Sequence, residues 1–449
     1  LTLSLTEFTA WMHRETPHNL VSDFSVRIMG SSSLWRGVIL ISMRFTWLWA
    51  LVVGIASAVR VHFSAQPDDW ASLWIAARMV ADGKTEHLYA LDPNDFASFS
   101  GDVWPAYAAE ISELAPYAHP FVHNPLVAYL LTPLTLLSFE QSVLLLAACN
   151  GVAVVAFAAA CLKLWGSFDA TKLVAASLVI WLSLPVQLSL WIGQTTPIII
   201  ALTVVGLALR RPWLAGFLLS CAVLVKLTPV ILIPVMLLWR RRAALWAAGW
   251  TAAWAIASVV LVPWATLRDW FTTLRWLGSK TLVAPVNQSV DSVVAQWSEP
   301  GKAEMLVEVR DAGEAVVWKL LICAVIAVVF AWAMWSSRQW RYHLAVTVVA
   351  CTVTAMASIV WSHYTMLAFL PLIGAGVVTR YQWVRIAAML PVVLLLPPLG
   401  EVFDPESTPL AFVGNGLGAM LAGVVIVVVA VGLQKDLKPD VGGLRSVTG

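Results

Sequence analysis

The sequence predicts an all-α integral membrane protein that crosses the bilayer many times. Of its 449 residues, 60% are hydrophobic and only 12% are charged, whereas a soluble globular chain carries about 25% charged residues. Apolar runs long enough to span a bilayer as helices recur along the chain, and we count about ten to twelve crossings by a 20-residue criterion. Many of the 25 tryptophans flank these runs, at the headgroup level that indole favours.

The first element is a polar, mixed segment, residues 1–44, that we predict to be cytoplasmic. Three arginines lie close to the first apolar run, namely Arg27, Arg36 and Arg44, and basic residues beside a span favour the cytoplasmic side. No short apolar core with a small-residue cleavage site precedes this run, so a cleavable signal is not expected. A single transmembrane domain, residues 45–433, and a cytoplasmic tail, residues 434–449, are expected to follow.

The first loop on the opposite, extracytoplasmic side, residues 62–123, is long and less apolar than its surroundings. Five apolar side chains within it recur at helical spacing: Trp70, Leu73, Trp74, Ala77 and Val80. We therefore predict an amphipathic helix that lies along the membrane surface. A second long segment, residues 267–316, is predicted on the same outer side.

Short basic loops orient the later spans. Four stretches are predicted to be cytoplasmic: Arg240–Arg242, Arg338–Arg341, Arg380–Arg385, and the tail with Lys435 and Lys438. Residues 173–211 fit less well, because strict alternation places Arg210 and Arg211 outside. Either the helices of this proline-containing stretch are broken, which is tolerated beside a polar cavity, or the two arginines bind a lipid phosphate.

Several classes of function are not indicated. The five cysteines fall within apolar stretches and show neither disulfide nor metal spacing. His119 and His123 have the spacing of a helical zinc pair, but Pro120 between them breaks that geometry, so no metal site is predicted. No other cofactor is expected, and dependence on a divalent metal stays open. No phosphate-cradling glycine loop is present, and a net charge of +2 does not indicate a nucleic-acid partner.

Two neighbouring carboxylates, Asp68 and Asp69, follow the first apolar run. Ionised groups at a membrane edge are costly unless they face water or a polar cavity, so they mark a candidate catalytic site. We expect Asp69 to act as a general base, with Asp68 as the second candidate. The alternative is that the two carboxylates cap the following helix at its N-terminus.

Lys226 and His363 are further ionisable residues that need an explanation. Lys226 lies deep in an apolar run of about 25 residues, where a lysine can neutralise a phosphate. Snorkelling of its side chain to the interface is the alternative. His363 follows a later apolar run on the same predicted side as Asp69. It is a candidate phosphate ligand, or a solvated helix end.

Amide side chains between apolar runs are candidates for binding hydroxyl groups of a substrate. Gln194 is followed by two threonines, and a helix cap is the alternative interpretation. Asn287 and Gln288 begin a tripeptide that formally matches a glycosylation sequon, a pattern that often arises by chance. In the second outer segment they are also candidates for contact with a substrate.

Together these stretches resemble the polytopic GT-C glycosyltransferases of family 87, the DUF2029 type. The patterns that carry the resemblance follow the family's order: Asp69–Ala77, Gly83 with Leu88-Tyr89, Asn124-Pro125-Leu126 with Pro133-Leu134, Gly193-Gln194, Lys226 with Pro229, Asn287-Gln288-Ser289, and Trp361-Ser362-His363. The resemblance spans most of the transmembrane domain. This chain departs from the family where Asn124 precedes Pro125 in place of a Pro-Pro pair, where Lys-Pro is spread over Lys226–Pro229, and where the last motif is shifted.

The family includes mycobacterial polyprenyl-phosphomannose-dependent mannosyltransferases and an arabinofuranosyltransferase. The resemblance therefore implies a GT-C-like helical bundle that transfers a sugar from a polyprenyl-phosphate donor to a membrane glycolipid or lipoglycan. Mannose is the first choice of sugar and arabinofuranose the second. The resemblance also implies a bacterial plasma membrane protein whose site faces the extracytoplasmic side.

The roles that the resemblance implies fall into three sets. Asp69, or else Asp68, is the base of an inverting displacement. The donor phosphate is held by Lys226, His363, Arg210 and Arg211. The sugar and the acceptor are contacted by Gln194, Asn287, Gln288, Asn124 and Tyr364.

A lipid or solute transporter, or a flippase, is the rival interpretation, because broken helices and a lysine within a span occur in transporters. The sequence shows no halves related by an internal repeat. The long aromatic outer loop also suits an enzyme better than a gate. Protein partners are not indicated.

Overall fold

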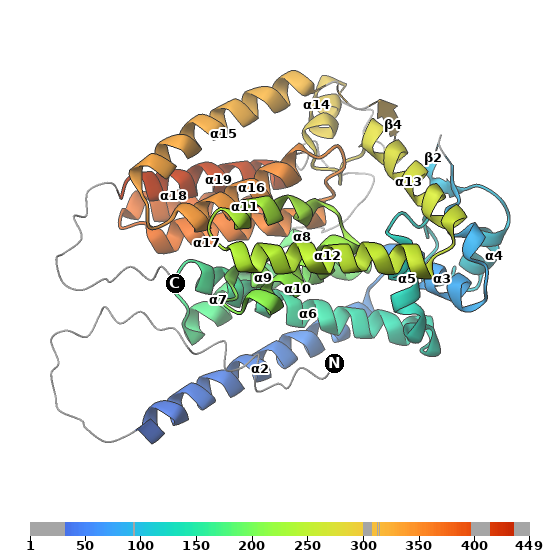
Figure 1. Cartoon of the computed structure of the whole chain (residues 1–449), viewed down its shortest axis with the longest axis horizontal. Coiled ribbons are helices and arrows are strands. Elements are labelled where there is room, and N and C mark those ends of the chain that lie inside the picture. Colours follow the sequence, from blue (N-terminus) through green and yellow to red (C-terminus); the bar gives the residue numbers. More distant parts are fainter. Residues whose placement is uncertain are drawn as a thin grey trace.

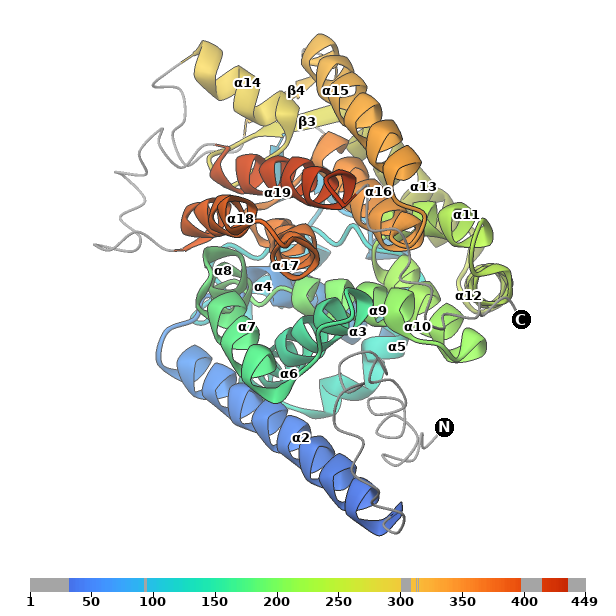
Figure 2. The same cartoon turned by 90° about the vertical axis from the view of Figure 1, so that its left-hand side faces the viewer.

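The computed structural model describes residues 32–92, 95–299, 308–311, 313, 315–396 and 414–434, and these form a bundle of helices (Figure 1). Eighteen helices are described: α2 (Ser32–Phe63), α3 (Asp68–Ala81), α4 (Val103–Ala109), α5 (Pro125–Leu131), α6 (Phe139–Leu164), α7 (Ala170–Leu182), α8 (Leu184–Trp191), α9 (Thr196–Ala208), α10 (Pro212–Val225), α11 (Leu232–Leu237), α12 (Arg241–Leu261), α13 (Trp264–Ser279), α14 (Val290–Ser298), α15 (Val316–Ser336), α16 (Arg341–Met356), α17 (Phe369–Val378), α18 (Gln382–Leu395) and α19 (Asn415–Gly432). Figures 1 and 2 place α2 and α15 at opposite edges of the bundle.

The remaining elements are short. Four 3-10 helices are described: η1 (Thr85–His87), η2 (Thr132–Leu136), η3 (Thr228–Ile231) and η4 (Ser362–Ala368). The strands form two antiparallel pairs, β1 (Leu91–Asp92) with β2 (Asp95–Phe99) and β3 (Lys280–Val283) with β4 (Glu308–Asp311). The all-α class predicted from the sequence is therefore confirmed, and each of the two predicted outer segments holds one of the described strand pairs.

Five of the described helices are long and apolar enough to cross a membrane: residues 44–63 of α2, then α6, α12, α15 and α19. The pair α7 and α8 forms a sixth candidate that is bent by 60° at residue 183. The count of ten to twelve rested on apolar runs, several of which the structure divides into helices of 10–17 residues. Prolines lie at or near the start of many of these pieces, for example Pro197 and Pro212, where proline costs a helix no hydrogen bond.

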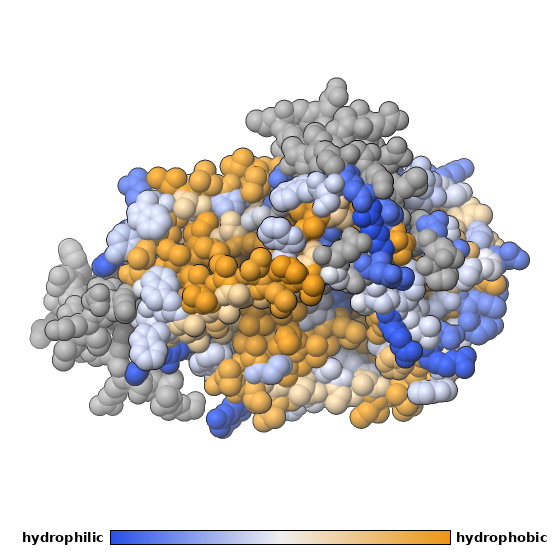
Figure 3. All heavy atoms as spheres, turned by 90° about the horizontal axis from the view of Figure 1, so that it is seen from above, coloured by the Kyte–Doolittle hydropathy of each residue, from blue (hydrophilic) through white to orange (hydrophobic). Residues whose placement is uncertain are grey.

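The outer surface is that of a membrane protein. Figure 3 shows hydrophobic residues over a broad part of one face, with hydrophilic residues gathered toward its right-hand end. In an apolar stretch of 18 residues of α12, only 17% of the residues are buried inside the protein, and in that of α15 only 11% are. Their exposed side chains include Val260 and Val328, at 74% and 71% exposed. Such faces are stable against lipid, whereas in water they would be an unusually large apolar patch.

Small residues allow α2 and α6 to pack closely. A Cβ atom added to Gly151 would lie 2.5 Å from the Ser57 hydroxyl oxygen and 2.5 Å from the Val53 carbonyl oxygen. The indole of Trp181 in α7 donates a hydrogen bond to the same Ser57 hydroxyl at 2.9 Å. Close approach through glycine and hydrogen bonding through serine are the usual means of joining helices in lipid.

The helix predicted in the first outer loop is present as α3, but it is buried on nearly all sides. Ala71, Ile75, Ala76 and Met79 are 0–1% exposed, and both Trp70 and Trp74 are buried. α3 packs against α5 and η2, and the Trp70 indole donates a hydrogen bond to the Ser142 hydroxyl of α6 at 2.8 Å. The pattern taken for a surface helix therefore belongs to a helix that is packed mainly against α5 and η2, which follow the outer loop in the chain.

The turn between α9 and α10 lies at the same end of the bundle as Arg240. The Arg240 guanidinium donates hydrogen bonds to the carbonyl oxygens of Leu207, at 2.7 Å, and Leu209. Arg210 and Arg211 follow directly, so they share the end that carries Arg240–Arg242. The structure thus groups these arginines with other basic residues, and it bends α7 against α8 by 60°, as expected for broken helices.

Candidate active site

The start of α3 is fastened to the end of α8. The backbone N–H of Gln66 donates to the Trp191 carbonyl at 2.8 Å, and that of Asp69 donates to the Ile192 carbonyl at 3.0 Å. The next residue, Gly193, has a φ of +72°, and a Cβ added there would lie 2.8 Å from the Trp70 Cβ. Only glycine adopts this backbone so close to a neighbour without strain. The turn presents Gln194 to Asp69.

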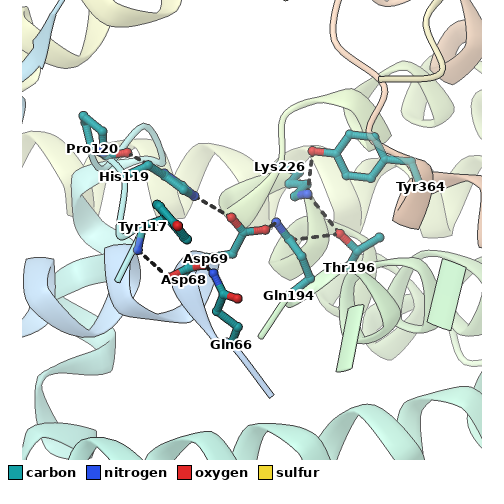
Figure 4. A network of polar contacts seen from close by, with 10 residues as sticks. All are labelled: Gln66, Asp68, Asp69, Tyr117, His119, Pro120, Gln194, Thr196, Lys226 and Tyr364. Carbon is teal, nitrogen blue, oxygen red and sulfur yellow. Dashed lines mark hydrogen bonds and ion pairs between the residues drawn. The ribbon is translucent and has the colours of Figure 1, made fainter. Parts of the chain in front are cut away.

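The Asp69 carboxylate is held from both sides (Figure 4). One oxygen, Oδ1, lies 2.6 Å from His119 Nε2, and the other, Oδ2, accepts a hydrogen bond from the Gln194 amide. Only 19% of the Asp69 side chain is exposed. The Gln194 backbone is fixed in turn, because its carbonyl accepts a hydrogen bond at 2.8 Å from Asn150 of α6.

Electrostatics favour the ionised form of Asp69. Burial acts to raise the pKa of Asp69, but the hydrogen bond and charge of His119, the charge of His363 and the hydrogen bond of Gln194 together lower it from its ordinary value. Burial likewise acts to lower the pKa of His119, and the contact with Asp69 reverses this, so that the pKa is raised. Each group thus favours the charged form of the other.

Asp68 makes a different set of contacts. Its Oδ1 accepts the backbone N–H of Tyr117 at 2.9 Å, and its Oδ2 accepts the Gln66 amide at 2.8 Å. Burial raises the pKa of Asp68 despite these hydrogen bonds. Both aspartates lie in the first turn of α3, and the described contacts of that helix include no side-chain cap. Asp68 therefore ties the outer loop to α3, while Asp69 faces the other polar residues.

Lys226 ends α10 and points into the same network (Figure 4). Its Nζ lies 3.1 Å from the Thr196 hydroxyl and 2.6 Å from the Tyr364 hydroxyl. The Thr196 hydroxyl donates to Gln194 Oε1 at 3.3 Å, and the Gln194 amide donates to Asp69. A relay of hydrogen bonds thus connects Lys226 to Asp69. The lysine is half-buried within this network rather than snorkelling to an interface.

His363 lies beside this network with hydrogen-bonding capacity to spare. Its side chain is 1% exposed, and neither ring nitrogen has a hydrogen-bond partner among the described residues. The ring stands edge-on to Tyr364, with centroids 4.7 Å apart, and it lies within electrostatic reach of Lys226 and Asp69. Buried polar atoms without partners are rare in proteins and call for an explanation such as a ligand.

Lys226 is one of the residues that line an apolar cleft. Its lining is formed by α9, the end of α10, η3, α11, α16 and η4: Thr196, Ile199, Ile200, Thr203, Lys226, Thr228, Pro229, Ile231, Leu232, Ala350, Thr354, Tyr364 and Leu367. The cleft encloses an empty volume of about 590 Å³, part of it open to the surroundings. One cation in the lining of an apolar cleft suits a molecule with an anionic head and an apolar tail.

Two of the expected phosphate ligands are not brought to this site. Arg211 precedes α10 and Lys226 follows it, and a helix of 14 residues is roughly 20 Å long. Arg210 and Arg211 therefore lie at the opposite end of the bundle from Lys226 and Asp69. A single phosphate cannot contact both ends.

Asn287 and Gln288 are near the site but are engaged by the backbone. Asn287 Oδ1 accepts the Val360 N–H at 2.8 Å, and Gln288 Oε1 accepts the Gly416 N–H at 3.0 Å. Both side chains are at most 3% exposed. They hold the segment that leads to His363 against the start of α19, and their contact with a substrate stays a prediction.

Asn124 is also engaged locally. Its Oδ1 accepts the Leu126 N–H at 2.9 Å at the start of α5, which makes it the N-cap of that helix. The Ser258 hydroxyl donates to the same oxygen at 3.3 Å. Asn124 thereby joins α5 to α12, and a role in binding sugar stays a prediction.

His119 and Thr196 are members of the network that sequence reasoning did not select. His119 was considered only as half of a zinc pair with His123. The useful signal was its place in the same outer loop as Asp69. Within the described residues no group of three or more His, Cys, Asp or Glu side chains is arranged to hold a metal ion.

A model of a protein family, described as glycosyltransferase family 87, matches residues 121–362, which is more than half of the chain. The matched range contains Gln194 and Lys226, whereas Asp69 and His119 precede it and His363 follows it directly. No curated protein and no solved structure matches the chain.

Proposed function

The chain belongs to glycosyltransferase family 87, and we propose that it transfers a sugar from a polyprenyl-phosphate donor to a membrane glycolipid or lipoglycan on the extracytoplasmic side. It is a glycosyltransferase with several membrane-spanning helices, which fits substrates that are themselves anchored in the bilayer. Mannose is the first choice of sugar. The observation that carries the proposal is the relay that places the Asp69 carboxylate and the Lys226 ammonium in one buried network.

In the proposed reaction Asp69 is the general base. It takes the proton of an acceptor hydroxyl while that oxygen attacks the anomeric carbon of the donor sugar. The bond between the anomeric carbon and the phosphate oxygen breaks, and polyprenyl phosphate leaves with the electron pair. Attack opposite to the leaving group inverts the anomeric configuration.

Lys226 and His363 are proposed to stabilise the departing phosphate. Charge develops on the leaving oxygen, and fixed cations and hydrogen-bond donors aimed at that charge contribute much of the catalysis in such reactions. Lys226 supplies the cation. The ring of His363 supplies a donor from one of its two buried nitrogens, neither of which has a partner among the described residues. The Tyr364 hydroxyl, which contacts Lys226, would lie beside the phosphate or the sugar.

The apolar cleft is proposed to take the first isoprene units of the donor. Lys226 is part of its lining, and the aliphatic side chains of the lining come from α9, η3, α11, α16 and η4. A phosphate at Lys226 would therefore have its lipid chain led along this cleft toward the bilayer. Among the described residues, we find no comparable basis for binding a nucleotide-linked sugar.

The test is sugar transfer in membranes that contain the full chain. Radiolabelled polyprenyl-phosphomannose is supplied with extracted membrane lipids, and labelled lipid products are separated and counted. We expect a labelled glycolipid with the native chain and none with Asp69→Asn. Label transferred only from a polyprenyl-phosphoarabinofuranose would keep the mechanism and change the sugar. Movement of either donor across the membrane without any labelled product would overturn the proposal in favour of a flippase.

A further inference from the structure

We propose that His119 is a positioning residue for Asp69: a ring protonated on both nitrogens that keeps the carboxylate ionised and oriented toward the acceptor. This inference rests on the proposed function, because it takes Asp69 to be the base. It assigns a role to a histidine that lies outside the family match. The acceptor hydroxyl itself is expected to meet Asp69, not His119.

The contacts of His119 determine how many protons it carries. Its Nδ1 lies 3.1 Å from the Pro120 carbonyl oxygen, and a carbonyl can only accept, so Nδ1 carries a hydrogen. Its Nε2 lies 2.6 Å from Asp69 Oδ1. An ionised carboxylate also only accepts, so Nε2 must carry a second hydrogen. Beside an ionised Asp69, His119 is therefore an imidazolium.

The loop that carries His119 is fastened at several points, so the ring is held in place. Upstream, the Tyr117 backbone N–H donates to Asp68 Oδ1 at 2.9 Å. Downstream, His123 Nδ1 lies 3.1 Å from the carbonyl oxygen of Val225, the residue before Lys226. The Tyr89 hydroxyl donates to the His123 carbonyl at 2.6 Å. One short loop thus joins the base to the end of α10.

The position of the ring decides which lone pairs of Asp69 remain available. His119 occupies one lone pair of Oδ1 and Gln194 occupies one of Oδ2. A carboxylate has about four lone-pair sites, so Asp69 keeps capacity to accept a proton while its plane is fixed from both sides. Fixing a base before the substrate arrives removes part of the entropic cost of the reaction.

Other charged or titratable groups also act on this pair: Asp68, His123, Lys226, His363 and Tyr364. Of these groups and His119, only His119 touches the Asp69 carboxylate directly. Burial acts to raise the pKa of Asp69, and the His119 contact is the largest of the effects that lower it. Removal of the ring should therefore raise the pKa of Asp69 and protonate the base at a higher pH.

The first test is the pH dependence of transfer from polyprenyl-phosphomannose by the native chain, His119→Gln and His119→Arg. With His119→Gln the rate at saturating substrate should fall, and the acid limb of its pH profile should move to higher pH. The alkaline limb caused by loss of the imidazolium proton should disappear. His119→Arg, which stays cationic, should return the acid limb toward its native position. The contrary result is an equal loss of transfer rate at every pH in both variants, with both limbs of the pH profile at their native positions. It would show that His119 is only a structural residue and would overturn the inference.

The matched control is His123→Gln, in the same loop. His123 bonds a backbone carbonyl rather than a carboxylate, and burial lowers its pKa to about 4. It is therefore neutral across the range of the assay. Its substitution should leave both limbs at their native pH. A shift of the acid limb equal to that of His119→Gln would mean that the loop, and not the His119 charge, sets the profile.

A second measurement separates this inference from the choice of donor. It follows the thermal unfolding midpoint of the full chain in detergent micelles against pH, without substrate. The pKa of His119 is raised in the fold, so its stabilising effect is complete below the unfolded value of about 6.5 and is lost as the pH rises through the folded value. The pKa of Asp69 is lowered, so its effect is complete above about 3.9 and is lost as the pH falls through the folded value.

The unfolding midpoint of the native chain should therefore exceed that of His119→Gln most strongly between about pH 3.9 and about pH 6.5. The difference between the two midpoints should shrink at alkaline pH. In an Asp69→Asn background the substitution of His119 should produce no such pH-dependent difference. If no variant transfers mannose but the midpoints follow this pattern, the donor proposal fails and the ion pair stands. A pH-independent difference in midpoint would overturn the ion pair. If His119→Gln does not fold, Asp69→Asn against the native chain gives the same comparison.

Discussion

Lys226 Nζ lies 2.6 Å from the hydroxyl oxygen of Tyr364, a residue 138 positions later in the chain. The same ammonium lies 3.8 Å from the centroid of the Tyr364 ring, a distance at which a cation is attracted to an aromatic face. This contact joins the end of α10 to η4. The cation proposed to receive the donor phosphate is thus positioned by the same segment that carries His363.

Asp69→Asn should abolish transfer while the protein still folds and inserts. The substitution keeps the size of the side chain but removes its basicity, and a general base typically contributes roughly 10²–10⁴-fold to the rate. The measurement is the initial rate at equal protein level in membranes. Asp68→Asn is the matched control, because Asp68 bonds Tyr117 and Gln66 instead, and it should retain most of the activity. Loss in Asp68→Asn together with turnover in Asp69→Asn would assign the base to Asp68.

Lys226→Met should raise the donor concentration needed for half-maximal rate, because the phosphate loses its cation. Lys226→Arg should rescue only in part, since a planar guanidinium does not replace a compact ammonium between Thr196 and Tyr364. Donor titrations at matched protein level measure the effect. Lys163→Met, in the last turn of α6 and away from the site, should leave the titration unchanged. An unchanged donor requirement in Lys226→Met would remove Lys226 from the phosphate site.

Gly193→Ala should displace Gln194 from Asp69. It should lower the transfer rate by more than its loss of stability alone would explain. A left-handed backbone costs an L-residue roughly 1–2 kcal/mol, and the added Cβ would also lie 2.8 Å from the Trp70 Cβ. Gly83→Ala isolates the backbone cost, because Gly83 has a φ of +74° with nothing within 4 Å of an added Cβ. Unfolding midpoints and rates are compared for both variants. Equal activity in the two would show that the turn at Gly193 does not position the site.

The orientation in the membrane can be tested by labelling single cysteines in intact cells. Glu113→Cys, exposed in the first outer loop, should react with an impermeant thiol reagent added outside, and Gln339→Cys, exposed beside Arg338, should not. The native chain already has an exposed cysteine, Cys149 on α6. Labelling of the native chain is therefore the control for reaction at Cys149. The reverse pattern of labelling would place Asp69 in the cytoplasm and contradict the proposed side of the reaction.

Helix formation and the membrane class could be predicted because both depend on local composition. Apolar runs and their flanking arginines are visible in a short window of sequence. The same local view explains the misplacement of α3, whose apolar residues are buried by α5 and η2 and not by lipid. Burial by distant segments overrides a helical pattern that would otherwise predict a surface position.

The site was predictable only in part, because its contacts join distant residues. Asp69, Gln194 and Lys226 could each be selected as polar groups in apolar surroundings, yet the relay through Thr196 depends on how α3, α9 and α10 meet. The pairing of Asp69 with His119 spans 50 residues. Conversely, Arg210 and Arg211 matched the chemistry of a phosphate site, but the length of α10 separates them from it.

The apolar cleft beside Lys226 has a consequence for how the enzyme would experience its substrate. The cleft includes Ile231, which is 37% exposed on the apolar surface. A donor held there keeps its lipid chain in the membrane. The enzyme therefore encounters donor molecules only as they diffuse within the plane of the bilayer. The relevant variable would be the number of donor molecules per lipid molecule, not their concentration in the sample. Added inert phospholipid should slow the reaction, and added buffer should leave its rate per enzyme molecule unchanged.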